Sequence, residues 1–188
     1  MKLSENAAQY LGQMEVKKDK TNDGKDNPTF GNFGFVNPAF QAEMIEEGWQ
    51  VGWAWCAIFT KVVAKNCFPY QDKILNSLFS PSAVQTYNNF KKAGYQVSMT
   101  PAVDTIVIWQ QYKNGEPNNI GTKEKPIYTG HAGIVVSVNP KDPSAFESIE
   151  GNTSTPGERE GYVVARHPHR VVADVQNGLK VLGFITIK

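Results

Sequence analysis

The apolar pattern of this 188-residue chain changes its period near residue 100, and that change restricts the fold class more than any other feature. Before it, apolar residues recur at helical spacing, with Ser, Asn or Pro at the starts of segments and Gly at the ends. The predicted helices are 4–15, 37–48, 56–68 and 80–94, the first with Ser4 as its N-cap. Beyond it, β-branched and aromatic runs alternate with Pro, Asn and Gly clusters, which is typical of antiparallel strands. The predicted strands are 104–112, 131–138, 145–152, 161–167 and 180–188. Helices followed by strands indicate an α+β fold.

The composition fits one compact domain over residues 1–188. Apolar residues make up 40% of the chain, and a chain of this length buries roughly 70% of its unfolded surface. The formal net charge is +1, which favours neither nucleic acid nor an anionic membrane as a partner. No stretch approaches the ~20 apolar residues of a membrane span, and the N-terminal stretch is too polar for a secretory signal. We therefore expect a monomer that is made in the cytoplasm.

The two cysteines lie on one predicted helix and differ in their position along it. Cys56 follows Trp55 at the start of that helix, and Cys67 lies near its end. About three helical turns, roughly 16 Å, separate them, so no disulfide can join them while the helix is intact. A helix start lowers the pKa of a thiol through its unpaired N–H groups and the helix dipole. Cys56 is therefore a candidate nucleophile, although burial as a small apolar residue is the alternative.

A cysteine nucleophile needs an imidazole, and the chain has three histidines. His131 follows a glycine and begins an apolar strand, so its ring can project from the end of a sheet. His167 and His169 lie in the basic stretch "ARHPHR", which is typical of a solvated strand end. One hairpin after His131, "SIEGNTS" places Glu150 and Asn152 on the same side of a strand with period two. Either side chain could accept a hydrogen bond from the imidazole and so fix its tautomer.

Several motifs in order resemble one known family. They are "WCAIF", "VDTIVIW", "GHAGIVVSV", "SIEGNTS" and "GEREGYVVARH". Together they resemble the CHAP family, the cysteine, histidine-dependent amidohydrolases/peptidases of the papain-like superfamily. The resemblance covers residues 48–170, with 1–47 as an N-terminal helical extension that is similar to that of single-domain peptidoglycan hydrolases. It implies a papain-like fold in which the catalytic cysteine lies at a helix N-terminus packed on a C-terminal antiparallel sheet.

The resemblance also implies roles for individual residues. Cys56 would be the nucleophile, His131 the base and then the acid, and Glu150 the residue that orients the imidazole, with Asn152 assisting. Gln50 has the spacing from the cysteine that an oxyanion-binding glutamine has in papain. The substrate would be peptidoglycan, cleaved at the muramoyl–L-alanine bond or within the stem peptide or crossbridge, and no cofactor would be required.

Four tryptophans are candidates for the walls of a substrate groove, or for the core. They are Trp49, Trp53, Trp55 and Trp109. Groove and core are equally expected for Trp53 and Trp55, and the core is expected for Trp109.

Two other functions stay open on the sequence. A zinc endopeptidase would use His131, His167 and His169, although the His-x-x-x-Asp of such enzymes is missing because Val135 follows His131 at that spacing. A non-catalytic wall-binding module could also use the same fold.

The loop "DKTNDGKD" is a candidate for a calcium site. An EF-hand is excluded because its twelfth position, counted from Asp19, is Phe30 instead of Glu. A looser oxygen site from Asp19, Asp23 or Asp26 remains a weaker expectation. Without a signal peptide, a wall hydrolase would reach its substrate through a holin, a phage particle or a secretion machine.

Overall fold

The computed structural model describes residues 1–17, 30–154, 161–173 and 175–188. The helices are α1 (Leu3–Ala8), α2 (Pro38–Glu46), α3 (Cys56–Cys67), a short 3-10 turn (Pro69–Gln71), α4 (Asp72–Leu78) and α5 (Ala83–Lys92). The strands are β1 (Val97–Ser98), β2 (Ile106–Lys113), β3 (Glu116–Pro117), β4 (Gly130–Val138), β5 (Ala145–Thr153), β6 (Val163–Val171) and β7 (Leu179–Ile185). The α+β class predicted from the sequence is confirmed. In the described segments no helix is long and apolar enough to cross a membrane.

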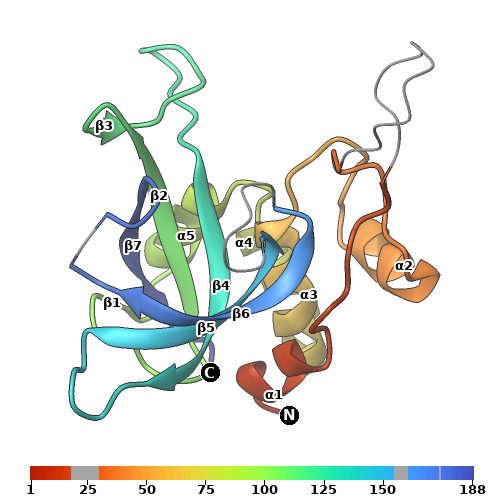
Figure 1. Cartoon of the computed structure of the whole chain (residues 1–188), viewed down its shortest axis with the longest axis horizontal. Coiled ribbons are helices and arrows are strands. Elements are labelled where there is room, and N and C mark those ends of the chain that lie inside the picture. The colour runs from red at the N-terminus through yellow and green to blue at the C-terminus, as the bar shows by residue number, and fades with distance from the viewer. Residues whose placement is uncertain (18–29, 155–160, 174) are drawn as a thin grey trace.

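The strands form one antiparallel sheet in the order β1-β7-β2-β4-β5-β6, with β3 added at the end of β2 (Figure 1). The register sets Trp109 of β2 opposite His131 of β4, and Gly133 of β4 opposite Glu150 of β5. On the next strand, Arg170 of β6 lies opposite Phe146 of β5. Polar side chains from three neighbouring strands can therefore meet on one face of the sheet.

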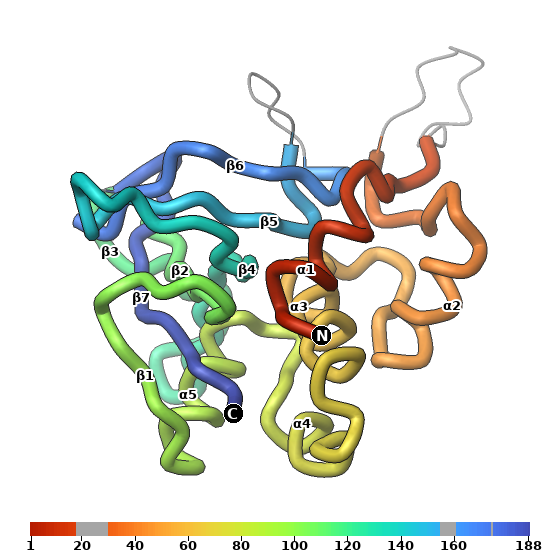
Figure 2. The backbone as a smooth tube through the Cα atoms, turned by 90° about the horizontal axis from the view of Figure 1, so that it is seen from below, coloured from red at the N-terminus to blue at the C-terminus, as the bar shows by residue number. Residues whose placement is uncertain are grey.

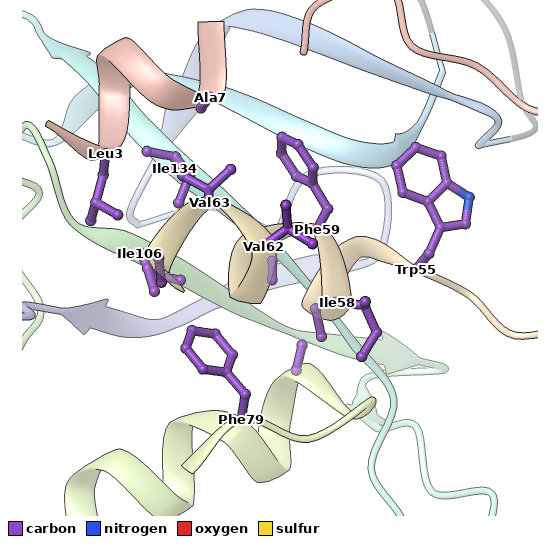
Figure 3. Packing of buried hydrophobic residues seen from close by; sticks show 14 of the residues in the cluster. Leu3, Ala7, Trp55, Ile58, Phe59, Val62, Val63, Phe79, Ile106 and Ile134 are labelled. Carbon is purple, nitrogen blue, oxygen red and sulfur yellow. The ribbon is translucent and has the colours of Figure 1, made fainter. Parts of the chain in front are cut away.

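Helix α3 is the central helix of the core. It packs on β4 and β5 and also contacts α1, α2, α4 and α5. Figure 2 shows α1 to α4 gathered at one side of the sheet. The α3 side chains Ile58, Phe59 and Val62 are buried, with Leu3 of α1 on one side and Phe79 on another (Figure 3). An apolar helix enclosed in this way has little freedom to shift, so its first residue is held at a fixed place beside the sheet.

Helix α1 is shorter than predicted. It ends at Ala8 instead of continuing to residue 15, and Lys2 rather than Ser4 occupies the N-cap position. Ser4 instead donates its backbone N–H and its hydroxyl to Asp104 Oδ1. After Gly12, which has a φ of 82°, the chain runs alongside β6 and exchanges backbone hydrogen bonds with Val164. This pairing satisfies backbone groups of both segments at the edge of the sheet.

The other predicted helices are close to those observed. Asn37 caps α2 and Ser82 caps α5 through their side chains, and α3 starts at Cys56. Helix α4 was not predicted from the sequence. It is a short segment whose Leu75 and Leu78 are its only buried residues, which is too few to show a helical period.

The N-terminal segment is bound to the start of α3 by one buried carboxylate. Glu15 is almost completely buried, and its Oε1 accepts a hydrogen bond of 2.7 Å from the indole N–H of Trp55. Its Oε2 accepts from the backbone N–H groups of Gly31 and Asn32. Trp55 itself has no exposed surface and lies against Phe35 and Phe59. Described residues before position 48, among them Glu15 and Phe35, therefore help to hold the start of α3 in place.

The Glu15 contact gives a stability prediction. Trp55→Phe keeps the buried ring but leaves Glu15 without the indole donor, so we expect it to lower the free energy of unfolding by about 2 kcal/mol. The matched control is Trp53→Phe, because Trp53 is 40% exposed and should change the stability by less than about 0.5 kcal/mol. Urea denaturation of the two variants measures the difference, and equal effects would contradict the assignment.

Candidate active site

Cys56 lies at the first residue of α3, where the helix N–H groups lack intrahelical acceptors. The side chain of Trp55, the N-cap residue, makes no capping hydrogen bond. Trp55 is instead anchored to the sheet, because its backbone N–H donates to Asn152 Oδ1 of β5 at 2.9 Å. Against the opposing effect of burial, the His131 side chain and the backbone N–H groups of Ala57 and Ala132 act on the thiol and lower its pKa. Cys56 keeps 6% of its surface exposed, so it is buried but not sealed.

His131 lies at the start of β4 and connects the helix to the sheet. Its Nε2 is 2.8 Å from Glu150 Oε2, and it is also hydrogen-bonded to Cys56. Because Nε2 faces the carboxylate, Nδ1 is the ring nitrogen left for the thiol. The Trp109 ring lies 5.6 Å from the imidazole, tilted by 33°. The imidazole therefore has a partner at each nitrogen and an aromatic neighbour that restricts its rotation.

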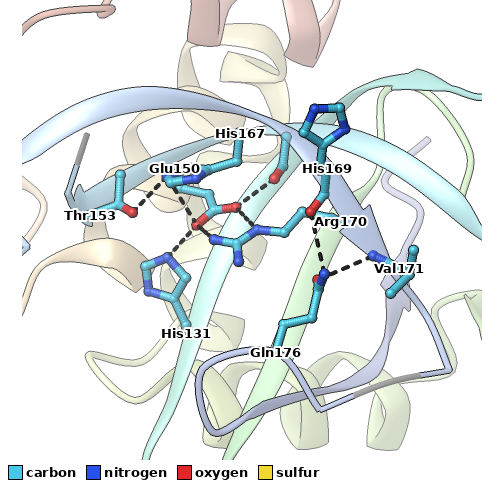
Figure 4. Close-up of polar contacts among 9 residues, drawn as sticks. His131, Glu150, Thr153, His167, His169, Arg170, Val171 and Gln176 are labelled. Carbon is cyan, nitrogen blue, oxygen red and sulfur yellow. Dashed lines mark hydrogen bonds and ion pairs between the residues drawn. The ribbon is translucent and has the colours of Figure 1, made fainter. Parts of the chain in front are cut away.

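Glu150 has no exposed surface, and its carboxylate is surrounded by donors (Figure 4). Besides His131, Arg170 donates from Nε to Oε1 at 2.9 Å and from a terminal nitrogen to Oε2 at 2.6 Å. Ser148 donates its hydroxyl to Oε1. Gly133 makes room for this side chain, since a Cβ there would come within 2.7 Å of Glu150 Cγ. Gly133, the second glycine in "GHAGIVV", is thus required by the close approach of Glu150 to β4.

These contacts shift the three pKa values in directions that favour charge. Burial raises the pKa of the Cys56 thiol, but the positive charge and hydrogen bond of His131 outweigh it and the net shift is downward. Burial lowers the pKa of His131, but Cys56 and Glu150 outweigh it and raise the pKa to about 10. Burial also raises the pKa of Glu150, but His131 and Arg170 hold it far below its usual range. The arrangement therefore favours a thiolate, an imidazolium and a carboxylate in a row.

Arg170 was not identified in the sequence, where its stretch was interpreted as a solvated strand end. It is buried, and its guanidinium carbon lies 5.2 Å from the centre of the Trp109 ring. The sequence offered one signal for Arg170, which is that a basic residue lies on β6, the strand that pairs with the strand of Glu150. The alternation of "ARHPHR" did not reveal it, because a bulge interrupts the pairing of β5 with β6.

That bulge also separates the two histidines of β6. Between the pairs Phe146↔Arg170 and Ser148↔His167 the register shifts by one residue, so His167 and Arg170 share a face although they are three residues apart. His167 Nε2 is 3.9 Å from Glu150 and is hydrogen-bonded to Thr153, whereas the ring of His169 points away (Figure 4). The predicted grouping of His131, His167 and His169 as a zinc site is therefore wrong. Among the residues that the structure describes, no group of three or more His, Cys, Asp or Glu could hold a metal ion.

A second register shift corrects the prediction for Asn152. The pairs Glu150↔Ala165 and Thr153↔Val163 enclose one extra residue on β5, and Asn152 has a φ of 52°. This turn ends the alternation, so Thr153 rather than Asn152 returns to the face of Glu150. Asn152 instead binds Trp55 N–H and donates to the backbone oxygen of Gly161 at 2.7 Å. It holds the start of α3 in place, and it is Glu150 that contacts the imidazole.

The remaining candidates divide between the core and the surface. Trp49, Trp55 and Trp109 are buried, so the prediction of Trp55 as a groove wall is wrong. Trp53 is partly exposed in the loop before α3, and Gln50 is exposed in the same loop. Within the described part of the chain, the Gln50 side chain has no hydrogen bond. The calcium candidates Asp19, Asp23 and Asp26 lie outside the described residues.

The comparison with protein families agrees with this geometry. The CHAP domain family matches residues 46–152, which is more than half of the chain, and the protein belongs to that family. CHAP domains are generally hydrolases of the amidase or peptidase type that act on peptidoglycan. No curated protein and no solved structure matches the chain. Cys56, His131 and Glu150 fall within the matched segment, whereas Glu15 and Arg170 lie outside it.

The opposite pKa shifts of the two thiols give a prediction about reactivity. The pKa of Cys56 is lowered, and burial raises that of Cys67. At about pH 6 we expect iodoacetamide to modify Cys56 at least tenfold faster, because only the thiolate reacts. Peptide mapping by mass spectrometry measures both sites in one sample.

The variant His131→Ala serves as the control for the imidazole. It should remove the preference for Cys56, since the imidazolium is the main group that stabilises the thiolate. A Cys67 that reacts as fast as Cys56 in the unmodified protein would contradict the ion pair.

Proposed function

We propose that this protein is a peptidoglycan hydrolase in which Cys56 attacks an amide carbonyl. The observation that carries the proposal is the continuous chain of contacts from Cys56 through His131 to Glu150. A nucleophile, a base and a group that orients the base are the three parts that covalent amide hydrolysis requires.

The reaction follows from the positions of the protons. The Cys56 thiolate forms a bond to the carbonyl carbon, and the carbonyl electron pair moves to oxygen to give a tetrahedral oxyanion. The oxyanion collapses, the C–N bond breaks, and the His131 imidazolium gives its proton to the leaving amine. His131, now neutral, takes a proton from water, whose oxygen attacks the thioester. This second tetrahedral intermediate collapses, the C–S bond breaks, and the carboxylic acid product leaves, which restores the ion pair of Cys56 thiolate and His131 imidazolium.

We propose two donors that stabilise the oxyanion. The backbone N–H of Cys56 is at the open start of α3, where the helix dipole also favours negative charge. Gln50, exposed in the loop before the helix, is the second donor in this proposal. Glu150 stays ionised throughout and keeps the imidazole in one orientation.

The substrate in this proposal is an amide of peptidoglycan, either the N-acetylmuramoyl–L-alanine bond or a bond within the stem peptide or crossbridge. The partly exposed Trp53 lies three residues before the nucleophile and offers an aromatic face on which a sugar or a peptide stem can pack. The chemistry needs a thiol, an imidazole and water, so we propose that it requires no bound cofactor.

Digestion of purified sacculi tests the proposal. We expect the wild-type protein to release muropeptides, and mass spectrometry of the new termini identifies the amide that is cut. Cys56→Ala should abolish release, a loss of at least 10³-fold, because the covalent step disappears.

The matched control is Cys67→Ala, which removes the other thiol and should retain activity. Release of the same muropeptides by Cys56→Ala would contradict the thiol mechanism. Binding to sacculi without any release by the wild type would favour a non-catalytic wall-binding module instead.

A further inference from the structure

The charges buried beside Cys56 balance only when Arg170 is included. The ion pair of Cys56 and His131 is neutral as a whole, and Glu150 adds one negative charge in a place without exposed surface. An uncompensated buried carboxylate is costly and tends to take up a proton. Arg170 supplies the fourth charge, and its two parallel hydrogen bonds of 2.9 and 2.6 Å reach both carboxylate oxygens.

The other groups around Glu150 do not replace this charge. Ser148 is neutral and donates one hydrogen bond. His167 lies 3.9 Å away, but burial lowers its pKa and so favours the neutral ring, which is hydrogen-bonded to Thr153. His131 is itself the group whose charge Glu150 stabilises. Among the described residues, Arg170 is therefore the permanent cation at this carboxylate.

The position of Arg170 is fixed from two sides. Its guanidinium lies over the Trp109 ring, and the same ring lies beside the imidazole of His131. The planar fork of an arginine matches a carboxylate in geometry, which the single charge of a lysine does not. Glu150 is thus both kept ionised and held in one orientation, with Oε2 directed at His131 Nε2.

We propose that Arg170 is a positioning residue of the active site, which acts through Glu150 to keep His131 charged and the Cys56 thiol ionised. This rests on the proposed function for its catalytic meaning. Arg170 lies beyond the segment matched by the CHAP family, so strand β6 completes a site whose other members lie within that segment.

The loss of Arg170 can act on the ion pair by two routes. If Glu150 stays ionised, the loss of a nearby positive charge makes the thiolate less stable, and the thiol pKa rises. If Glu150 takes up a proton, the imidazolium loses its stabilising carboxylate, and the pKa of His131 falls. Because His131 and Ser148 still donate to Glu150 without Arg170, we expect the first route, which moves the midpoint of Cys56 ionisation upward.

The pH dependence of Cys56 alkylation by iodoacetamide, followed by peptide mapping, tests the proposal. We expect Arg170→Gln to raise the midpoint by about one pH unit or more. Arg170→Lys retains the charge but not the fork, so its midpoint should lie between those of the wild type and Arg170→Gln. The matched control is Arg166→Gln on the same strand, since Arg166 pairs with Glu147 at the exposed surface and should not shift the midpoint.

The outcomes separate this proposal from the proposed function, because alkylation needs no substrate. A folded Arg170→Gln protein with the wild-type midpoint overturns the role of Arg170 even if sacculi are digested. If Arg170→Gln shifts the midpoint but the wild-type protein never digests sacculi, the role of Arg170 is supported and the proposed function is overturned. If circular dichroism shows that Arg170→Gln does not fold, Arg170→Lys decides the question, and a wild-type midpoint in that variant overturns the proposal.

Discussion

The site depends on a carboxylate that is ionised in the interior of the protein. Glu150 has no exposed surface, and such a group would ordinarily be neutral. Here Arg170, Ser148 and His131 supply four hydrogen bonds to its two oxygens. Because the carboxylate remains charged, the imidazole beside it is stabilised as a cation, and that cation lowers the pKa of the thiol. Each charge in the row is favourable only in the presence of its neighbours.

The position of the thiol depends on a second set of contacts, which comes from distant parts of the chain. Asn152 of the sheet accepts a hydrogen bond from the backbone N–H of Trp55, and Glu15 of the N-terminal segment accepts one from its indole N–H. These bonds fix the start of α3, which the long apolar face of the helix then keeps in register with β4 and β5. Residues on both sides of the family segment thus hold the residues inside it, Glu15 before it and Arg170 after it.

Much of this could be predicted from local sequence, because it depends on local rules. The change of period indicated the α+β class, and the predicted helices 37–48 and 80–94 contain α2 and α5. The position of Cys56 at a helix start and that of His131 at a strand start follow from the same rules. Glu150 could be identified as a candidate from the sequence, because its strand follows one hairpin after His131 and the period of two assigns its side chain to one face.

The errors have a common cause, since each depends on contacts between distant residues. The two β-bulges on the β5–β6 pair reversed the expected faces of Asn152 and His169. Burial of Arg170 required its ion pair with Glu150, which no pattern within "ARHPHR" contains. Trp55 was expected with equal weight in the groove and in the core, and it is buried against Phe35 and Phe59, with Glu15, forty residues earlier, accepting its indole N–H.

The protonation state of His131 at neutral pH tests the central claim most directly. Nitrogen-15 NMR of the histidine rings distinguishes an imidazolium from either neutral tautomer, and a pH titration follows the change. The structure predicts that His131 is an imidazolium at pH 7 and loses its proton only near pH 10. A neutral His131 ring at pH 7 in the folded wild-type protein would contradict the ion pair with Cys56 and the mechanism built on it.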